Sequence, residues 1–220
     1  MPLNDPDERL GTMANDKHKT FNELRQSRTD GIDYRICVSQ RNGPIAIVAP
    51  HGGYIEPATS RIAAAIAGDI YNLYCFEGLK PRPHCELHIT STNFDEPRCL
   101  ELISKCEVVI SVHGLESQEE RVDVGGRDKE LRDSICKVLS DSGFSAQAVS
   151  KGDHAAISAA NICNRGSKNA GVQLEITSGL RVALRRRSEI VRFADAIRSA
   201  IAATRACDAK RPHVQRFKPT

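Results

Sequence analysis

Two histidines and one glutamate stand at positions in this sequence where they could share a metal ion. His51 and Glu56 are five residues apart, and the Gly52-Gly53 pair between them lets the chain turn tightly so that both side chains can face one ion. His113 follows a second apolar run and is the candidate for a third ligand. Catalytic zinc takes about three protein ligands of this chemistry and keeps one position open. The spacing alone leaves open the alternative that His51 packs in a loop and that Glu56 is favoured by a helix dipole.

The other histidines have weaker support as metal ligands. His84 and His88 are four residues apart, but a strand would place them on one face with no matching carboxylate nearby, so we interpret both as structural or pocket-lining residues. His154 lies in a polar segment, and His18 and His213 lie near the termini. These last three are expected to be solvated.

Apolar runs that alternate with amphipathic segments predict an α/β fold with a single domain. The runs at 45–49 and 108–112 are typical of buried strands, and 171–176 predicts a further strand. Further strands are expected at 34–38, 73–76 and 86–90, and helices at 20–26, 59–68, 95–105, 127–142 and 188–205. This order predicts a mixed, mostly parallel sheet flanked by helices. Functional residues of such sheets gather at the carboxyl ends of the strands, which is where His51 and His113 stand.

Composition indicates an ordinary globular protein. The chain has 220 residues, a formal net charge of +3 and eight cysteines, none of them in a Cys-x-x-Cys pair. We therefore expect free thiols, and neither a structural zinc knuckle nor a disulfide framework. The mild charge excess lies at 185–187 and in the tail, which is weak support for nucleic-acid binding, so no nucleic-acid partner is expected.

The segments at the two ends predict where the folded domain begins and ends. Residues 1–17 are polar and are expected to be a disordered lead-in, with Met13 as an alternative start. The folded domain is expected at 18–207, and a basic tail at 208–220. The sequence has neither an apolar signal-peptide core nor a long apolar run. These features predict a monomeric cytoplasmic protein without a membrane partner, released by cell lysis if it derives from a phage.

Several motifs in one order resemble the poly-γ-glutamate hydrolase family, which is known from bacteriophages that infect capsule-forming bacilli. They are APHGGYIEPATS at 49–60, YCFEG at 74–78, LHITSTNFDEP at 87–97, VHG at 112–114, VGG at 124–126, NICNRG at 161–166 and GVQLE at 171–175. The similarity covers roughly 21–205. It implies a fold similar to that of zinc carboxypeptidases, with a mixed sheet between helices.

The resemblance also implies roles for individual residues. His51, Glu56 and His113 would bind zinc, and Glu175 would be the general base and acid. The alternative for Glu175 is an edge or rim carboxylate. An acid in the apolar context VQLEI is unusual enough to favour a role. Arg165, which precedes the Glu175 strand, is the first candidate for a cation that stabilises the oxyanion. The remaining substrate-binding candidates are Arg127, Arg181, Asn161, Asn164 and Tyr54, and surface charge is the alternative for each arginine.

The expected function is that of a zinc-dependent hydrolase that cleaves the γ-glutamyl amide bonds of poly-γ-glutamate, using a zinc-activated water and a glutamate base. The expected partner is thus an acidic polymer or another γ-glutamyl substrate. The alternatives are a zinc amidohydrolase of small N-acyl amino acids or γ-glutamyl peptides, and a non-catalytic protein that binds anionic polymer. Tyr54 and Ala58 replace glycines of the family pattern, and Leu115 replaces a small or polar residue. These departures spare the ligands but leave the substrate open.

Overall fold

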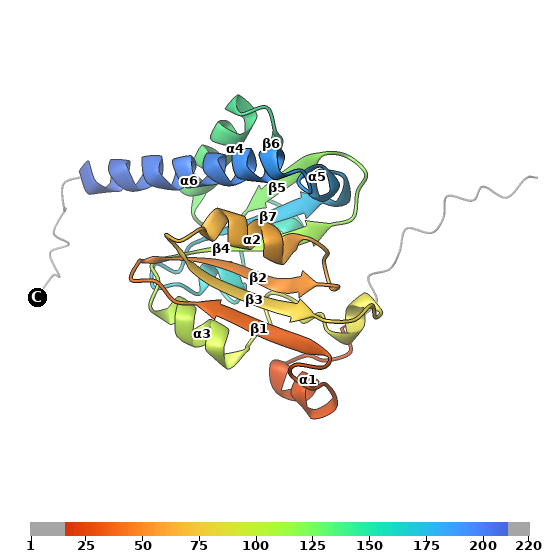
Figure 1. Ribbon diagram of the computed structural model, residues 1–220. Coiled ribbons are helices and arrows are strands. Elements are labelled where there is room, and N and C mark those ends of the chain that lie inside the picture. Colours follow the sequence, from red (N-terminus) through yellow and green to blue (C-terminus); the bar gives the residue numbers. More distant parts are fainter. Residues whose placement is uncertain (1–15, 211–220) are drawn as a thin grey trace, which may run out of the picture.

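Seven strands form one mixed sheet with the order β1-β3-β2-β4-β7-β5-β6 in the computed structural model, which describes residues 16–210 (Figure 1). The pairs β2/β3, β2/β4, β4/β7 and β5/β6 are parallel, and β1/β3 and β5/β7 are antiparallel. The prediction of a mixed, mostly parallel sheet is confirmed. The strands are β1 Tyr34–Ser39, β2 Ile45–Gly53, β3 Asn72–Gly78, β4 Val108–Leu115, β5 Arg121–Gly125, β6 Ser145–Ala148 and β7 Val172–Thr177.

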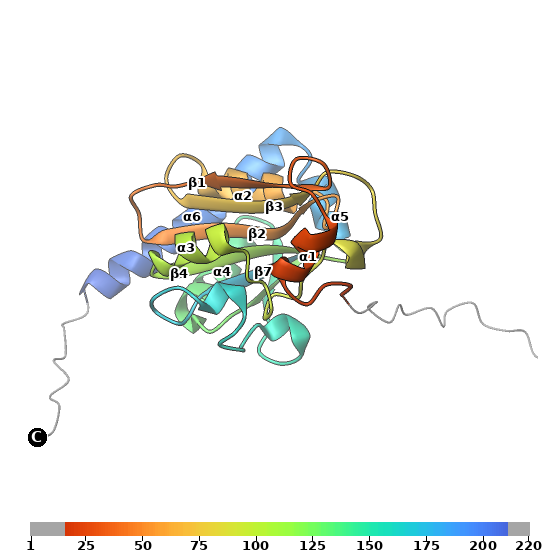
Figure 2. The same cartoon turned by 90° about the horizontal axis from the view of Figure 1, so that it is seen from below.

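Helices cover both faces of the sheet (Figures 1 and 2). One core packs α2, α4 and α6 against the sheet, and a second core packs α1 and α3 against the opposite face. None of the helices in the described part of the chain is long and apolar enough to cross a membrane. The helices are α1 Phe21–Ser27, α2 Thr59–Ala67, α3 Pro97–Ser104, α4 Lys129–Asp141, α5 Ser178–Ala183 and α6 Arg187–Lys210, with short 3-10 turns η1 His84–Glu86, η2 Asp153–Ala155 and η3 Ile162–Asn164.

Strand alternation decides which side of the sheet carries the polar residues. In β4, Ile110 and Val112 belong to the core beneath α2, α4 and α6, whereas Val109 belongs to the core on the other face. Successive side chains of a strand point to opposite faces. Ser111 and His113 therefore share the face of Val109, which is the face of α1 and α3.

Four elements differ from those that periodicity predicts. Residues 86–90 form no strand; η1 and a loop occupy this region, because His84 O accepts backbone bonds from Leu87 and His88 instead of pairing with a neighbouring strand. The short strands β5 and β6 and the helix α5 were not predicted. β6 has four residues, none of them buried, so it lacks the apolar pattern on which a prediction depends.

The N-cap of α3 is also one residue later than expected. A helix expected at 95–105 would have Asp95 as its cap, but Glu96 accepts the Cys99 N–H in that role. Asp95 instead accepts the backbone N–H of Phe21 and ties α1 to the start of α3. Both are acids ahead of Pro97, so only the tertiary contact with α1 separates their roles.

Candidate metal centre and active site

His51 and Glu56 meet because the chain after β2 turns back on itself. Glu56 N donates to His51 O at 2.8 Å, which closes the loop. Gly53 makes the turn with φ +66°, and a Cβ there would lie 2.2 Å from Gly78 O. Only glycine suits both the left-handed conformation and this close approach to β3. The Gly-Gly pair therefore has the positioning role that the sequence predicts.

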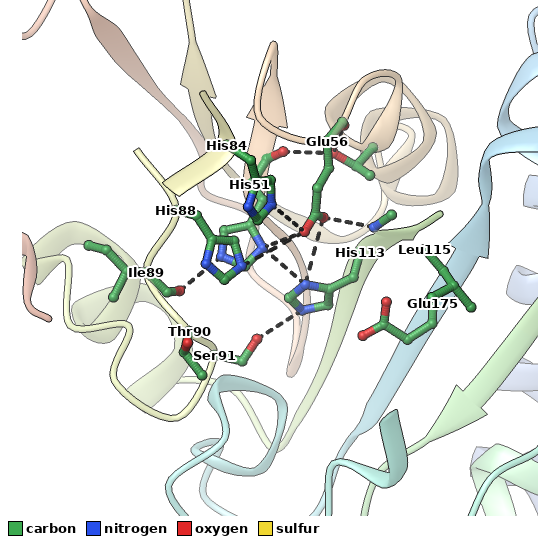
Figure 3. Close-up of polar contacts among 12 residues, drawn as sticks. His51, Glu56, His84, His88, Ile89, Thr90, Ser91, His113, Leu115 and Glu175 are labelled. Carbon is green, nitrogen blue, oxygen red and sulfur yellow. Dashed lines mark hydrogen bonds and ion pairs between the residues drawn. The ribbon is translucent and has the colours of Figure 1, made fainter. Parts of the chain in front are cut away.

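The ligand atoms of His51, Glu56 and His113 converge at the carboxyl ends of β2 and β4 (Figure 3). His51 Nδ1 lies 3.0 Å from Glu56 Oε1 and 3.2 Å from His113 Nδ1, and His113 Nδ1 lies 3.8 Å from Glu56 Oε2. Ligand atoms on one tetrahedral zinc ion are about 3.3 Å apart at the usual bond lengths. All three side chains are buried. Two of the three separations thus lie close to the value for a zinc ion, and the 3.8 Å pair exceeds it by about 0.5 Å.

The outer atoms of the same three side chains are held by a second set of groups. His51 Nε2 lies 2.9 Å from Ile89 O, His113 Nε2 lies 3.3 Å from Ser91 Oγ, and Gly114 N donates to Glu56 Oε2 at 2.7 Å. Because a carbonyl can only accept, Nε2 of His51 carries a proton. In its neutral form, His51 would therefore present an Nδ1 lone pair to Glu56 and His113. Such outer contacts are typical of imidazoles that bind metal ions.

Charge in the cluster favours a cation beside Glu56. Burial would raise the pKa of Glu56, but the neighbouring His51 holds it well below its usual value. Burial works against the imidazolium form of His51, yet Glu56, together with the Ile89 carbonyl and Glu175, outweighs it and raises the pKa of His51. Burial lowers the pKa of His113 to about 3. The buried carboxylate is thus stabilised by positive charge at the point where the imidazoles meet, and a metal ion would supply that charge.

His84 and His88 lie beside this cluster and correct one expectation. His84 Nε2 is 3.8 Å and His88 Nε2 is 4.0 Å from Glu56 Oε1, so the expectation that no carboxylate lies near them is wrong. The reason is that η1 and the following loop, and not a strand, bring both rings against Glu56. His51, Glu56 and His88 each offer a ligand atom within 4.8 Å of the others. His88 also contacts Asp16, whose Oδ1 lies 2.6 Å from His88 Nδ1.

His18 does not have the solvated position expected of it. It is buried, and its ring lies 3.4 Å from Ser27 Oγ, next to α1. His213, for which the same expectation was made, lies outside the described residues.

Glu175 stands next to His113 across the sheet. The two residues are register partners in the parallel strands β4 and β7, and the Glu175 carboxylate lies beside the His113 ring in Figure 3. Burial and the charge of Glu56 raise the pKa of Glu175 to about 8. A carboxyl group in this range can both take and return a proton near neutral pH.

Two amide side chains hold Glu175 in place. Gln173 Nε2 donates to Glu175 Oε1 at 2.7 Å, and Asn161 Nδ2 donates to Gln173 Oε1 at 2.9 Å. Asn161 Oδ1 in turn accepts the Cys163 N–H and caps η3. The sequence reasoning missed Gln173, although its position two residues before Glu175 puts both side chains on one strand face.

Asn164, one of the residues predicted to bind substrate, is held among loops. Asn164 is buried, and its amide binds only backbone groups: it donates to Ala156 O and Ser158 O and accepts from the backbone N–H of Arg127 and Gly171. This is the arrangement of a residue that braces loops.

The other candidate substrate-binding and catalytic side chains differ in their contacts and in their exposure. Arg165 Nη1 donates to Phe94 O at 2.9 Å. Arg127 and Tyr54 are exposed, and Tyr54 lines a small hollow with His84, Lys80 and Arg82.

Arg181 clamps the segments that carry the site. Its guanidinium donates to Pro57 O at 2.7 Å, Leu115 O at 3.3 Å and Ile176 O at 3.0 Å. These carbonyls lie one residue after Glu56, two after His113 and one after Glu175. A Cβ on Gly114 would lie 2.8 Å from Arg181 Cζ, so the guanidinium packs directly behind the strand.

Comparison with known sequences gives one consistent result. A family model described as poly-gamma-glutamate hydrolase matches residues 18–197. The chain is 41% identical over 167 residues to the SPbeta prophage-derived UPF0714 protein YoqZ of Bacillus subtilis (strain 168), covering 76% of the chain and 60% of YoqZ. It is 36% identical over 172 residues to the UPF0714 protein YndL of the same organism, covering 78% and 68%. The match thus spans three fifths of YoqZ.

Comparison with solved structures agrees with the comparison of sequences. A bacteriophage poly-gamma-glutamate hydrolase superposes with a TM-score of 0.83 at 31% identity, over 88% of this chain and all of the other. A zinc-free structure of YndL superposes with a TM-score of 0.80 at 31% identity, over 86% and 99%. An N-formylglutamate amidohydrolase from Ralstonia eutropha JMP134 shares the fold at 10% identity, with a TM-score of 0.52 over 79% and 99%. The predicted single-domain, zinc carboxypeptidase-like fold is confirmed.

Proposed function

We propose that this chain, which belongs to the poly-gamma-glutamate hydrolase family, is a zinc-dependent hydrolase that cleaves γ-glutamyl amide bonds of an acidic polymer. The observation that carries this proposal is the convergence of His51 Nδ1, His113 Nδ1 and the Glu56 carboxylate next to Glu175. A cation-binding set beside a buried carboxyl group of raised pKa is the equipment that amide hydrolysis needs.

His51, Glu56 and His113 would hold the metal ion. Zinc bound there would polarise the scissile carbonyl and activate water. Ile89 O and Ser91 Oγ fix the imidazole rings from outside, and Gly114 N fixes the carboxylate. Rings held in this way keep their Nδ1 atoms directed at one point, which lowers the cost of organising the site when the ion binds.

Glu175 would take a proton from the attacking water and deliver it to the departing amine. The residue is 8% exposed and its carboxyl group is held by Gln173, so the carboxyl group has little freedom to turn away. A nearby cation would lower its pKa from about 8 toward neutrality, where a base works best. Asn161 acts through Gln173 and is a positioning residue.

The proposed substrate class follows from the family and from the need to bind carboxylates. Poly-γ-glutamate carries a carboxylate on every residue, and arginine is well suited to such groups. Arg127 and Tyr54 are proposed substrate contacts because both are exposed. Arg165 is proposed to support the site from the Phe94 side, where its guanidinium binds a carbonyl.

The test follows polymer size and bound zinc in the same samples. Zinc-loaded protein is incubated with poly-γ-glutamate, and the polymer is sized by gel filtration. We expect a fall in polymer mass with the parent, and no fall with Glu175→Gln, which should retain zinc on elemental analysis. His113→Ala should lose zinc and activity together, whereas His18→Asn, a control outside the cluster, should lose neither.

Three other outcomes would overturn parts of the proposal. Intact polymer together with hydrolysis of N-acyl glutamate would replace the polymer with a small substrate. Polymer bound but never cut, under any metal, would indicate a binding protein. Unchanged turnover in Glu175→Gln would remove Glu175 from the reaction.

A further inference from the structure

Three imidazole rings stack in a column beside Glu56 (Figure 3). The His84 and His88 ring centroids are 4.3 Å apart with a 32° tilt, and those of His88 and His51 are 4.0 Å apart with a 36° tilt. The column runs from the His84 side chain, which is 45% exposed, to that of His51, which is 1% exposed. His84 and His88 are not needed by the ligand set of His51, Glu56 and His113, so two imidazoles remain at the site without an assigned task.

The two oxygens of Glu56 face different groups. Oε2 accepts the Gly114 N–H and is the oxygen nearer to His113 Nδ1. Oε1 lies 3.0 Å from His51 Nδ1 and also faces the outer part of the column, with His84 Nε2 at 3.8 Å and His88 Nε2 at 4.0 Å. One carboxylate is therefore shared between the inner ligand set and two further imidazole nitrogens.

Asp16 prepares His88 to act as a ligand. Asp16 Oδ1 lies 2.6 Å from His88 Nδ1, and Asp16 Oδ2 accepts the Thr90 N–H and the Thr90 hydroxyl, each at 2.7 Å. The carboxylate is fixed by Thr90, so it holds the imidazole proton on Nδ1 and leaves the Nε2 lone pair directed at Glu56. A carboxylate behind an imidazole is the usual outer partner of a metal-binding histidine. Asp16 precedes the family match, which begins at residue 18.

We propose that His84 Nε2, His88 Nε2 and Glu56 Oε1 form a second, outer site for a divalent cation of the zinc type. Imidazole nitrogens and one carboxylate oxygen are the donors that zinc prefers. The separations of 3.8 and 4.0 Å exceed the roughly 3.3 Å across a tetrahedral zinc ion. The half-exposed His84 side chain can close this difference by a small rotation, so the outer site binds more weakly than the inner one.

Zinc stoichiometry tests this proposal without reference to catalysis. The full chain is stripped with a chelator, dialysed against buffered free zinc over a range of concentrations, and measured by elemental analysis. The parent should bind two zinc ions per chain, one more tightly than the other. His84→Ala and His88→Ala should each retain the tight ion and lose the weak one, whereas His113→Ala should lose the tight one.

Asp16→Asn provides a finer test, because it keeps the size of the side chain and removes its charge. It should weaken the second ion about 10-fold or more and leave the first unchanged. His18→Asn is the matched control, a histidine near the same segment that does not contact Glu56, and it should bind two ions. Circular dichroism melting identifies any variant that fails to fold; His84 is half exposed, so its replacement should be tolerated.

Two results would overturn the proposal. One is a parent that binds a single zinc ion throughout the range. The other is a His88→Ala variant that loses the tight ion while His113→Ala retains it, because His88 would then belong to the inner set. Neither result depends on polymer cleavage, so failure of the outer site and failure of the proposed function are distinguishable.

Discussion

Gln173 donates a hydrogen bond of 2.7 Å to Glu175 from the same face of β7. The bond favours the ionised carboxylate and opposes the burial that raises the pKa of Glu175. Asn161 holds Gln173 in turn, at 2.9 Å. A chain of two amides thus sets both the orientation and the proton affinity of the proposed base.

Gln173→Leu should therefore change the pH dependence of the reaction. Loss of the donor raises the pKa of Glu175 further, so the acidic limb of the kcat/KM profile should move to higher pH, with kcat lowered about 10-fold at neutral pH. Gln147→Leu is the matched control, since Gln147 in β6 donates at 2.8 Å to Asp123 in β5 and not to Glu175. An unshifted limb in Gln173→Leu would show that this bond does not tune the base.

Glu175 should also make the stability of the chelator-treated protein depend on pH. Its pKa is about 8 in the fold and near 4.5 in the unfolded chain, so the folded state holds an extra proton between these values. Stability contributed by that proton is fully present below pH 4.5 and is lost as the pH rises through 8, at up to about 1.4 kcal/mol per pH unit. Glu175→Gln has no such proton, so its melting temperature should exceed that of the parent by more at pH 8 than at pH 5. Equal differences at both pH values would contradict the raised pKa.

The core of the fold could be predicted because burial leaves a periodic signal. The runs that became β2, β4 and β7 are almost entirely buried, and each was predicted within a few residues of its observed bounds. β6 was missed because all four of its residues are at least partly exposed. An edge strand is held by pairing with its neighbour, and backbone pairing leaves no mark on composition.

The residues of the site also divide into those whose positions follow from buried strands and those whose positions do not. His51 and His113 end buried strands, so their convergence could be predicted from strand order. The contacts of His88 with Glu56 and Asp16 could not, because they join three irregular segments that lie far apart in the sequence. Arg181 was predicted to bind substrate, and only the structure reveals the three backbone carbonyls that occupy its guanidinium.

Arg181→Lys should weaken metal binding more than it weakens substrate binding. A lysine has one ammonium group and cannot bind carbonyls of three segments at once, so the segments after Glu56, His113 and Glu175 should loosen. We expect zinc affinity to fall about 10-fold, measured by competition with a chelating dye, with KM little changed once zinc is saturating. Arg61→Lys is the control, because Arg61 Nη2 also donates to backbone carbonyls, those of Leu184 and Arg185.

The two explanations of Arg181 predict opposite patterns. A residue that binds substrate carboxylates would raise KM on replacement and leave zinc affinity unchanged. That pattern would restore the substrate-binding role that the sequence suggested.

Ala58 occupies a backbone conformation that glycine would adopt more easily. It is the N-cap of α2, with φ +78° and no side-chain cap bond. A left-handed conformation costs an L-residue about 1–2 kcal/mol. Glycine avoids this cost, but part of the gain is lost because glycine has more conformational freedom in the unfolded chain. Ala58→Gly should therefore raise the free energy of unfolding by about 0.5–1 kcal/mol in urea. Ala64→Gly, in the right-handed interior of the same helix and on its exposed side, should lower it by about 1 kcal/mol. If both variants lose stability equally, the strain at Ala58 is not real, and the Glu56 loop adopts another conformation in solution.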